Sequence, residues 1–326
     1  MNHRQRMQAC VSGSEIDRPP VALWRHFPVD DQDPKRLAES ILQFQNTYDF
    51  DFIKITPASS FCVRDYGVTD AWRGNPEGTR DFLTHPVEKP EDWASLNKLP
   101  PQEGYLKDQL ECVKLIKLGA QDTPFLQTIF DPMSQAKNLA GKERLLVHMR
   151  EYPQNLHTGL KRITENTISF IEACKSIGID GVFFAIQHAQ ASLLSRAEFK
   201  EFVLPYAREI MSHVNDRWLN LIHVHGKDIY FDEISELPAT IYNWHDQETS
   251  PSLSLAKSLC SAAVCGGLKQ WETLVYGSPD QVSQEARLAI EQTGGKRFIL
   301  GTGCVLPIIA PHANISAVRK IVEEVS

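Results

Sequence analysis

Eight short apolar runs, separated by stretches of helical periodicity, constrain the fold of this chain more than any other feature. A run such as Val-Phe-Phe-Ala-Ile at 182–186 is apolar throughout, which is typical of parallel strands that are covered on both faces. The predicted strands are residues 21–24, 52–56, 125–130, 181–186, 221–225, 240–244, 263–268 and 297–301. Strands that alternate with helices form either an open doubly wound sheet or a closed barrel.

The barrel is favoured over the open sheet. No Gly-x-Gly-x-x-Gly or Gly-x-x-x-x-Gly-Lys-Ser/Thr motif follows any predicted strand, as nucleotide-binding open sheets would require. The helices between the strands have clear starts: Ser195 and Glu198 form a capping box, and Ser278 precedes Pro279. The 326 residues contain no linker that would mark a second domain. We therefore expect one α/β domain over residues 1–326, a (β/α)8 TIM barrel.

One connection is much longer than the others. It separates the second and third predicted strands by roughly 70 residues, and residues 71–101 within it are rich in proline, glycine and charge. We expect this insertion to cross the C-terminal mouth of the barrel, with a hairpin and without a core of its own, and to cover the site. The segment before residue 20 is expected to form a helix that closes the opposite end.

Charge, hydropathy and cysteine content exclude several classes of protein. The formal net charge of −7, without any basic run, argues against binding to nucleic acid or anionic membranes. No apolar stretch approaches the length of a membrane span, and the first residues lack the apolar core of a signal peptide. Seven irregularly spaced cysteines favour reduced thiols. We expect a cytoplasmic enzyme with a small-molecule substrate.

The ends of the predicted strands, where barrel enzymes place catalytic groups, carry several histidines. The sharpest pattern is His223-x-His225, because side chains two apart on a strand face the same way, with α-carbons roughly 6.6 Å apart. Cys304, in a turn after the last strand, can reach the same mouth because an eight-stranded barrel is narrow. Two imidazoles and a thiolate suit zinc and leave one tetrahedral position open. The same residues also fit ordinary strand sequence and a buried small thiol.

His245 and Asp246 follow the sixth predicted strand. They fit a general base, a fourth metal ligand or a hydrogen-bonded core histidine with its neighbouring acid. The cysteines other than Cys304 lie in helices, loops or strand bodies and are interpreted as structural: Cys10, Cys62, Cys112, Cys174, Cys260 and Cys265.

Two further strand ends contribute polar side chains. Arg25 is placed to hold a substrate carboxylate or phosphate, or else to pair with Asp30 or Asp31. Gln187 and His188 are expected to form a polar wall of the pocket that binds a cofactor.

Five segments carry a family resemblance: Arg-Pro-Pro-Val-Ala-Leu-Trp-Arg at 18–25, Gly-Val-Phe-Phe-Ala-Ile-Gln at 181–187, Leu-Ser-Arg-Ala-Glu-Phe-Lys-Glu-Phe-Val-Leu-Pro-Tyr at 194–206, His-Val-His-Gly at 223–226 and Gly-Thr-Gly-Cys-Val-Leu-Pro at 301–307. Through them, the chain resembles the uroporphyrinogen decarboxylase superfamily from about residue 18 to residue 325. That superfamily also contains the zinc-dependent methylcobalamin:coenzyme M methyltransferases.

The chain departs from the decarboxylases of that superfamily at two places. Those enzymes bind the carboxylates of their tetrapyrrole through an arginine- and glycine-rich N-terminal motif and use an aspartate at the end of the second strand. Here no Gly-Arg pair follows Arg25, and the second strand ends in Thr56-Pro57, with no aspartate before Asp65. Both departures count against uroporphyrinogen decarboxylation.

The chain agrees better with the methyltransferases, which bind zinc through His-x-Cys-Gly at the fifth strand and a cysteine after the eighth. His223 and Cys304 match this pattern, and His225 stands in place of a cysteine; histidine is itself a competent zinc ligand. The resemblance implies a zinc-dependent methyltransferase that activates a thiol, with His245 or Asp246 either accepting its proton or orienting a zinc ligand. It also implies a corrinoid, carried by a partner protein, as the methyl donor.

Two other functions stay open. A decarboxylase or lyase would act on a tetrapyrrole or a small carboxylate, with Arg25 holding the carboxylate. A non-catalytic barrel would only bind a tetrapyrrole or a corrinoid. Decarboxylases of the superfamily pair across their clefts, so the resemblance also allows a homodimer.

Overall fold

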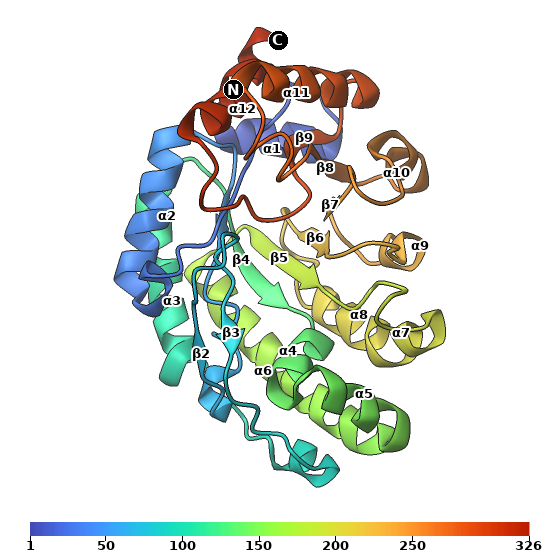
Figure 1. Ribbon diagram of the computed structural model, residues 1–326. Coiled ribbons are helices and arrows are strands. Elements are labelled where there is room, and N and C mark those ends of the chain that lie inside the picture. The colour runs from blue at the N-terminus through green and yellow to red at the C-terminus, as the bar shows by residue number, and fades with distance from the viewer. Residues whose placement is uncertain (326) are drawn as a thin grey trace.

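Seven parallel strands form one curled sheet in the computed structural model, which describes residues 1–325 (Figure 1). In spatial order they are β1 (Ile53–Ile55), β4 (Phe125–Phe130), β5 (Gly181–Ile186), β6 (Leu221–Val224), β7 (Ile241–Trp244), β8 (Ala263–Leu268) and β9 (Phe298–Thr302). Every strand pairs in parallel with the next of these strands along the chain. Seven of the eight predicted strands are confirmed, each with its ends within one residue of the prediction.

The first predicted strand, residues 21–24, is wrong as a regular strand. Val21 forms an isolated parallel bridge with Leu300 of β9. The N–H of Leu300 donates to the carbonyl of Pro20 at 2.8 Å, and the N–H of Ala22 donates to the carbonyl of Leu300 at 3.0 Å. The N–H of Val21 instead donates to the carboxylate of Asp51, and Pro20 has no N–H, so the segment has few donors for a ladder.

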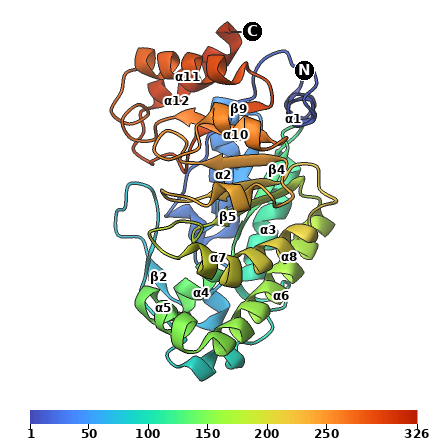
Figure 2. The ribbon, with the colours of Figure 1, turned by 90° about the vertical axis from the view of Figure 1, so that its right-hand side faces the viewer.

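Helices cover the outside of the curled sheet, as both ribbon views show (Figures 1 and 2). Their bounds are α1 (His3–Ser12), α2 (Pro34–Tyr48), α3 (Gly104–Gly119), α4 (Pro132–Ala140), α5 (Lys142–Glu151), α6 (Pro153–Ile177), α7 (Arg196–Phe202), α8 (Leu204–Ser212), α9 (Phe231–Ile234), α10 (Leu253–Leu259), α11 (Pro279–Thr293) and α12 (His312–Glu324). Short 3-10 turns span Asp30–Gln32, Arg64–Tyr66 and Pro90–Ser95. The predicted capping boxes at Ser195 and Ser278 are both present.

The N-terminal helix α1 lies at the amino ends of the strands, as predicted. Arg6 of this helix donates to Asp51, just before β1, at 2.7 Å. Arg4 binds Asp180, just before β5, with Nη2 and Oδ2 3.1 Å apart. These ion pairs connect the helix to two separate strands, so this end of the sheet is covered.

The connection from β1 to β4 contains α3 and an antiparallel pair of two-residue strands, β2 (Asp70–Ala71) and β3 (Asp81–Phe82). Glu77, Thr79, Arg80 and Phe82 from this pair and its turn line the same cavity as residues at the strand ends. Whether this connection opens and closes as a cover over the mouth stays a prediction.

The core lies between the sheet and the helices. Phe52, Phe184, Phe298 and Trp244 from the strands or their edges are among its largest fully buried side chains. All seven cysteines carry free thiols. Within residues 1–325, no helix has the length and apolar character needed to cross a membrane.

Candidate metal centre

A cavity of about 270 Å³ opens at the carboxyl ends of the strands. Its walls come from the connection between β1 and β4 and from side chains of the sheet. The sheet side of the cavity is lined by Lys54, Thr56, Thr128, Phe130, Phe183, Ala185, Gln187, His223 and His225, with Trp24, His26, Cys304 and Val305 from the flanking segments. The predicted metal ligands thus share one cavity.

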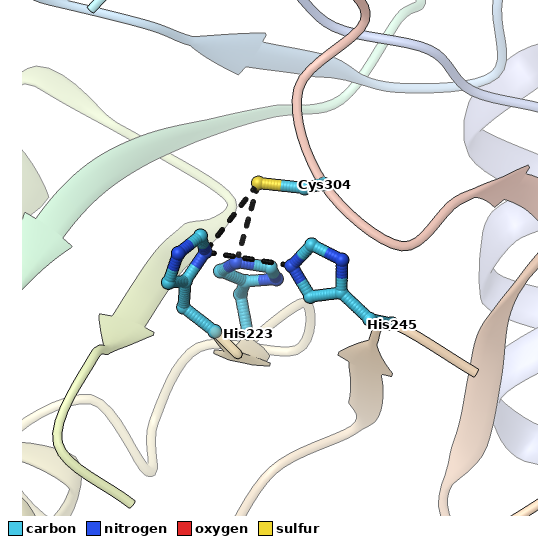
Figure 3. Close-up of side chains that lie close together, drawn as sticks. His223, His245 and Cys304 are labelled. Atoms are coloured by element: carbon cyan, nitrogen blue, oxygen red, sulfur yellow. Dashed lines mark hydrogen bonds between the residues drawn. The ribbon is translucent and has the colours of Figure 1, made fainter. Parts of the chain in front are cut away.

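Four side chains meet at the edge of this cavity, and Figure 3 shows the imidazoles of His223 and His245 and the sulfur of Cys304 turned toward one another. The Cys304 Sγ lies 3.7 Å from Nε2 of His223 and 3.8 Å from Nδ1 of His225. Nε2 of His245 lies 3.4 Å from Nδ1 of His225. One ligand atom from each of the four lies within 4.8 Å of all the others.

These separations fit a tetrahedral zinc ion. With Zn–S of about 2.3 Å and Zn–N of about 2.05 Å, tetrahedral geometry places a sulfur and a nitrogen about 3.6 Å apart and two nitrogens about 3.3 Å apart. The two sulfur–nitrogen distances of 3.7 and 3.8 Å and the nitrogen–nitrogen distance of 3.4 Å are close to these values. The donor set of imidazoles and one thiol is also the set that zinc prefers.

Asn243 of β7 fixes the orientation of His223. Its Nδ2 donates to the carbonyls of Cys265 and Thr302, both at 2.9 Å, so its Oδ1 is the acceptor left for the imidazole. That Oδ1 lies 2.7 Å from Nδ1 of His223, which must therefore carry the proton. The lone pair of His223 is then on Nε2, the atom that faces Cys304, and this hydrogen bond orients a ligand as metal sites commonly require.

Glu248 lies behind His245 in the same way. Its Oε1 is 3.8 Å from Nδ1 of His245, while its other oxygen pairs with Lys227 at 3.0 Å. A carboxylate behind an imidazole favours a proton on the near nitrogen and leaves the far nitrogen free to ligate. The free nitrogen, Nε2, is the one that faces His225.

Burial keeps this cluster uncharged when no metal is bound. It lowers the pKa of His223 well below its ordinary value and that of His225 to about 4, and charges on neighbouring imidazoles lower both further. It also lowers the pKa of His245 and raises that of the Cys304 thiol to about 12. The imidazoles are therefore ready to ligate at neutral pH, whereas the thiol must lose its proton when a metal binds.

Asp246 is placed away from the cluster. Its carboxylate accepts hydrogen bonds from the backbone N–H of Gly267 in β8, at 3.1 Å, and from Nε2 of Gln247, at 2.7 Å. Burial raises its pKa to about 7. Asp246 is not part of the cavity wall that the described residues form. Its catalytic role therefore stays a prediction, which its position does not support.

Arg25 also points elsewhere. Its guanidinium lies over the rings of Phe27 and Phe44, 5.1 and 5.9 Å from their centroids. Within residues 1–325 it forms no ion pair, so the alternative pairing with the aspartates at 30 and 31 is not found either. Its neighbours Trp24 and His26 line the cavity, as expected if side chains alternate along an extended segment.

The predicted polar wall is only half present. Gln187 lines the cavity and accepts a hydrogen bond from Nζ of Lys137 at 3.2 Å. His188 is buried beside Ser134, with Nδ1 and Oγ 3.4 Å apart, and burial lowers its pKa to about 3. It is not part of the cavity wall formed by residues 1–325.

The sequence reasoning missed several residues that the cavity brings forward. Asn243 and Glu248 support the histidines, and Lys54 and His26 line the cavity. The available signal for Lys54 was its position between two isoleucines in an otherwise apolar strand. Nothing local distinguishes Asn243 from any other polar residue in a strand, because its role depends on contacts with three different strands.

The amino-acid sequence of this chain is similar to those of two uroporphyrinogen decarboxylases. The chain is 28% identical over 260 residues to a uroporphyrinogen decarboxylase of Rhodococcus opacus, covering 75% of this chain and 71% of that protein. It is 22% identical over 253 residues to the uroporphyrinogen decarboxylase of Geotalea daltonii, covering 73% and 71%.

Solved structures share the fold. A methyltransferase from Methanosarcina mazei superposes with a TM-score of 0.88 at 19% identity, covering 100% of this chain and 99% of that one. A B12-independent methionine synthase from a Shewanella species gives a TM-score of 0.59 at 12% identity, covering 94% and 93%. The sequence model of the family described as Uroporphyrinogen decarboxylase (URO-D) matches residues 2–325. This match extends over nearly the whole chain, which therefore belongs to the uroporphyrinogen decarboxylase family.

Proposed function

We propose that this barrel enzyme is a methyltransferase that activates a thiol substrate at a zinc ion held by His223, His225 and Cys304. The observation that carries the proposal is that the Cys304 sulfur lies 3.7 and 3.8 Å from the facing nitrogens of His223 and His225, close to tetrahedral separations, at the edge of a cavity. A bound zinc ion supplies a Lewis acid that lowers the pKa of a thiol and so maintains the thiolate nucleophile.

The protein's own residues account for the remaining requirements. His245 is neutral and its Nε2 lies within 4.8 Å of each ligand atom, so it can complete the donor set or accept the proton that the thiol loses. Glu248, behind it, would stabilise the imidazolium formed by that transfer. The sulfur then forms a bond to a methyl group as the donor's bond to that methyl breaks. We propose a corrinoid on a partner protein as the donor.

An enclosed site favours this chemistry because it keeps water from the nucleophile. We infer that residues 21–24 take the place of an eighth strand and close the curled sheet into a barrel. Their backbone forms hydrogen bonds with β9 on one side and with Asp51, two residues before β1, on the other. Val21 accepts from the N–H of Asp51 at 2.8 Å, which is the link on the β1 side.

Decarboxylation of a tetrapyrrole or small carboxylate is the second candidate, and the names of the curated relatives favour it. For a tetrapyrrole, the cavity supports it less well. Arg25 does not line the cavity, and Arg80, which does, is already paired with Asp31 at 3.2 Å and with Asp70. A tetrapyrrole with many carboxylates would need several unpaired cations here.

The deciding experiment measures metal and reaction together. We expect purified protein to bind one equivalent of zinc and to demethylate methylcobalamin in the presence of a small thiol, with the thioether as product. Protein that binds no zinc when zinc is offered, and that releases carbon dioxide from uroporphyrinogen, would establish the second candidate instead. Protein that binds cobalamin or a tetrapyrrole without turnover would indicate a binding barrel.

A further inference from the structure

Lys54 of β1 is a buried cation that lacks a carboxylate partner. Its side chain lines the cavity, and the residue is 7% exposed. Nζ donates to Oγ1 of Thr56 at 3.1 Å and lies 4.6 Å from the centroid of the Phe183 ring. It has no ion pair in the part of the chain that the structure describes, and burial lowers its pKa to about 7. A lysine is seldom buried without an acidic partner, because the desolvated charge is costly.

His26 is a second unsatisfied group in the same cavity. It is 8% exposed, and its Nδ1 is a buried atom without a hydrogen-bond partner among residues 1–325. His26 and Lys54 line the same cavity. Burial lowers the pKa of His26 to about 3, and the positive charge of Lys54 lowers it further. A buried polar atom without a partner indicates a missing ligand or water.

Lys54 also lies close to the metal cluster. Its Nζ lies 4.6 Å from the centroid of the Phe183 ring, and that ring stacks on the imidazole of His223 with the centroids 5.5 Å apart. The other lysine of the cavity, Lys137, is half-buried and differs because it already donates to Gln187. Of these two lysines, Lys54 therefore has only a hydroxyl as its acceptor among the described residues.

We propose that Lys54 and His26 form a subsite for a carboxylate of the substrate, beside the metal cluster. This assignment rests on the proposed function, in which the thiol of the same substrate lies at the cluster. A carboxylate carries the single negative charge that one ammonium can balance, and its second oxygen can accept from the imidazole. Hydrogen bonds between charged groups are stronger than neutral ones, so the subsite would select carboxylated thiols over neutral thiols.

The test compares mercaptopropionate with mercaptopropanol by calorimetric titration of the zinc-loaded chain. We expect mercaptopropionate to bind on the order of tenfold more tightly, the scale of one buried charge-assisted hydrogen bond. Lys54→Met should abolish this preference, and Lys54→Arg should retain part of it. The matched control is Lys137→Met, which removes the other lysine of the cavity and should keep the preference. Circular dichroism verifies that each variant is folded.

Metal-free protein separates this proposal from the proposed function. Propionate, which has no thiol, should raise the melting temperature of the metal-free wild type and leave that of Lys54→Met unchanged. If the protein binds no zinc but still binds propionate in a way that depends on Lys54, only the proposed function fails. The subsite is overturned if the wild type shows no preference for mercaptopropionate or if Lys54→Met keeps it. It is also overturned if Lys54→Met weakens zinc binding alone, because Lys54 would then serve the Cys304 thiolate.

Discussion

The two ends of the barrel treat buried charge in opposite ways. At the amino end, the fully buried carboxylate of Asp51 accepts from Arg6 and Arg18, both at 2.7 Å, and lies 3.0 Å from Nδ1 of His3. Burial disfavours its ionisation, but hydrogen bonds from His3 and Arg18 hold its pKa at about 2. At the carboxyl end, Lys54 is also buried but has no acid beside it among the described residues.

This contrast separates groups that stabilise the fold from groups that await a ligand. A charge network whose members are all paired can be fully accounted for by the protein itself. Unpaired buried groups reduce stability, and they persist where binding offsets that loss. The amino end is thus expected to determine stability, and the carboxyl end to determine what binds.

The largest effect is expected at the amino end. Asp51→Asn leaves the buried guanidinium of Arg18 without its counter-charge and removes one of the two carboxylates that pair with Arg6, so it should lower the free energy of unfolding by about 3–5 kcal/mol. Denaturant titration measures it. The control is Asp49→Asn. Asp49 also pairs with His3, but its side chain is 58% exposed, so this variant should lower the free energy of unfolding by less than about 1 kcal/mol. Comparable losses in the two variants would contradict the view that burial makes the Asp51 network decisive.

The next effect concerns zinc. Cys304→Ser removes the only thiolate of the cluster and should weaken zinc binding by at least about 100-fold, while unfolding of the metal-free protein changes little. A competition titration with a chelator measures the affinity. The control is Cys260→Ser. Cys260 is half-buried and its thiol donates a hydrogen bond to the carbonyl of Ala256, so this variant should bind zinc as the wild type does. Full zinc retention by Cys304→Ser would place the metal elsewhere.

The sequence predicts a strand well where a local pattern determines it, and poorly where a contact with a distant segment does. Strands β5 and β8 were predictable to the residue because both their faces are buried and no polar side chain interrupts either run. Residues 21–24 were not, because the carboxylate of Asp51 takes the N–H of Val21 from across the fold. Local patterns predict elements well and hydrogen bonds between distant segments poorly.

The same distinction applies to the site. The spacing of His223 and His225 correctly places both on one face, since side chains alternate along a strand. That alternation also turns Arg25 away from the cavity while His26 lines it, although the sequence interpretation chose Arg25 for its charge. The importance of Lys54 was not readable, because the absence of a partner is a property of the whole fold.

A smaller effect is expected at Lys54, with the opposite sign to that at Asp51. Replacing an unpaired buried ammonium by methionine should raise the free energy of unfolding by about 1–2 kcal/mol at pH 6. The pKa of Lys54 is about 7 in the fold and about 10.4 in the unfolded chain. Between these values the unfolded chain binds more protons, so wild-type stability rises with pH and the advantage of Lys54→Met shrinks. An advantage that grows from pH 6 to pH 9 would contradict this assignment.

The smallest effect is expected at Glu248. Glu248→Gln keeps the shape of the side chain but removes the charge behind His245, so zinc affinity should fall by about two- to tenfold. The loss should lie at the lower end for such supporting residues, because the carboxylate is 33% exposed, is shared with Lys227 and lies 3.8 Å from the imidazole. The same chelator competition measures it, with Glu236→Gln, an exposed partner of Arg208, as the control. A loss as large as that of Cys304→Ser would mean that Glu248 ligates the metal itself, and the donor set would then contain a carboxylate.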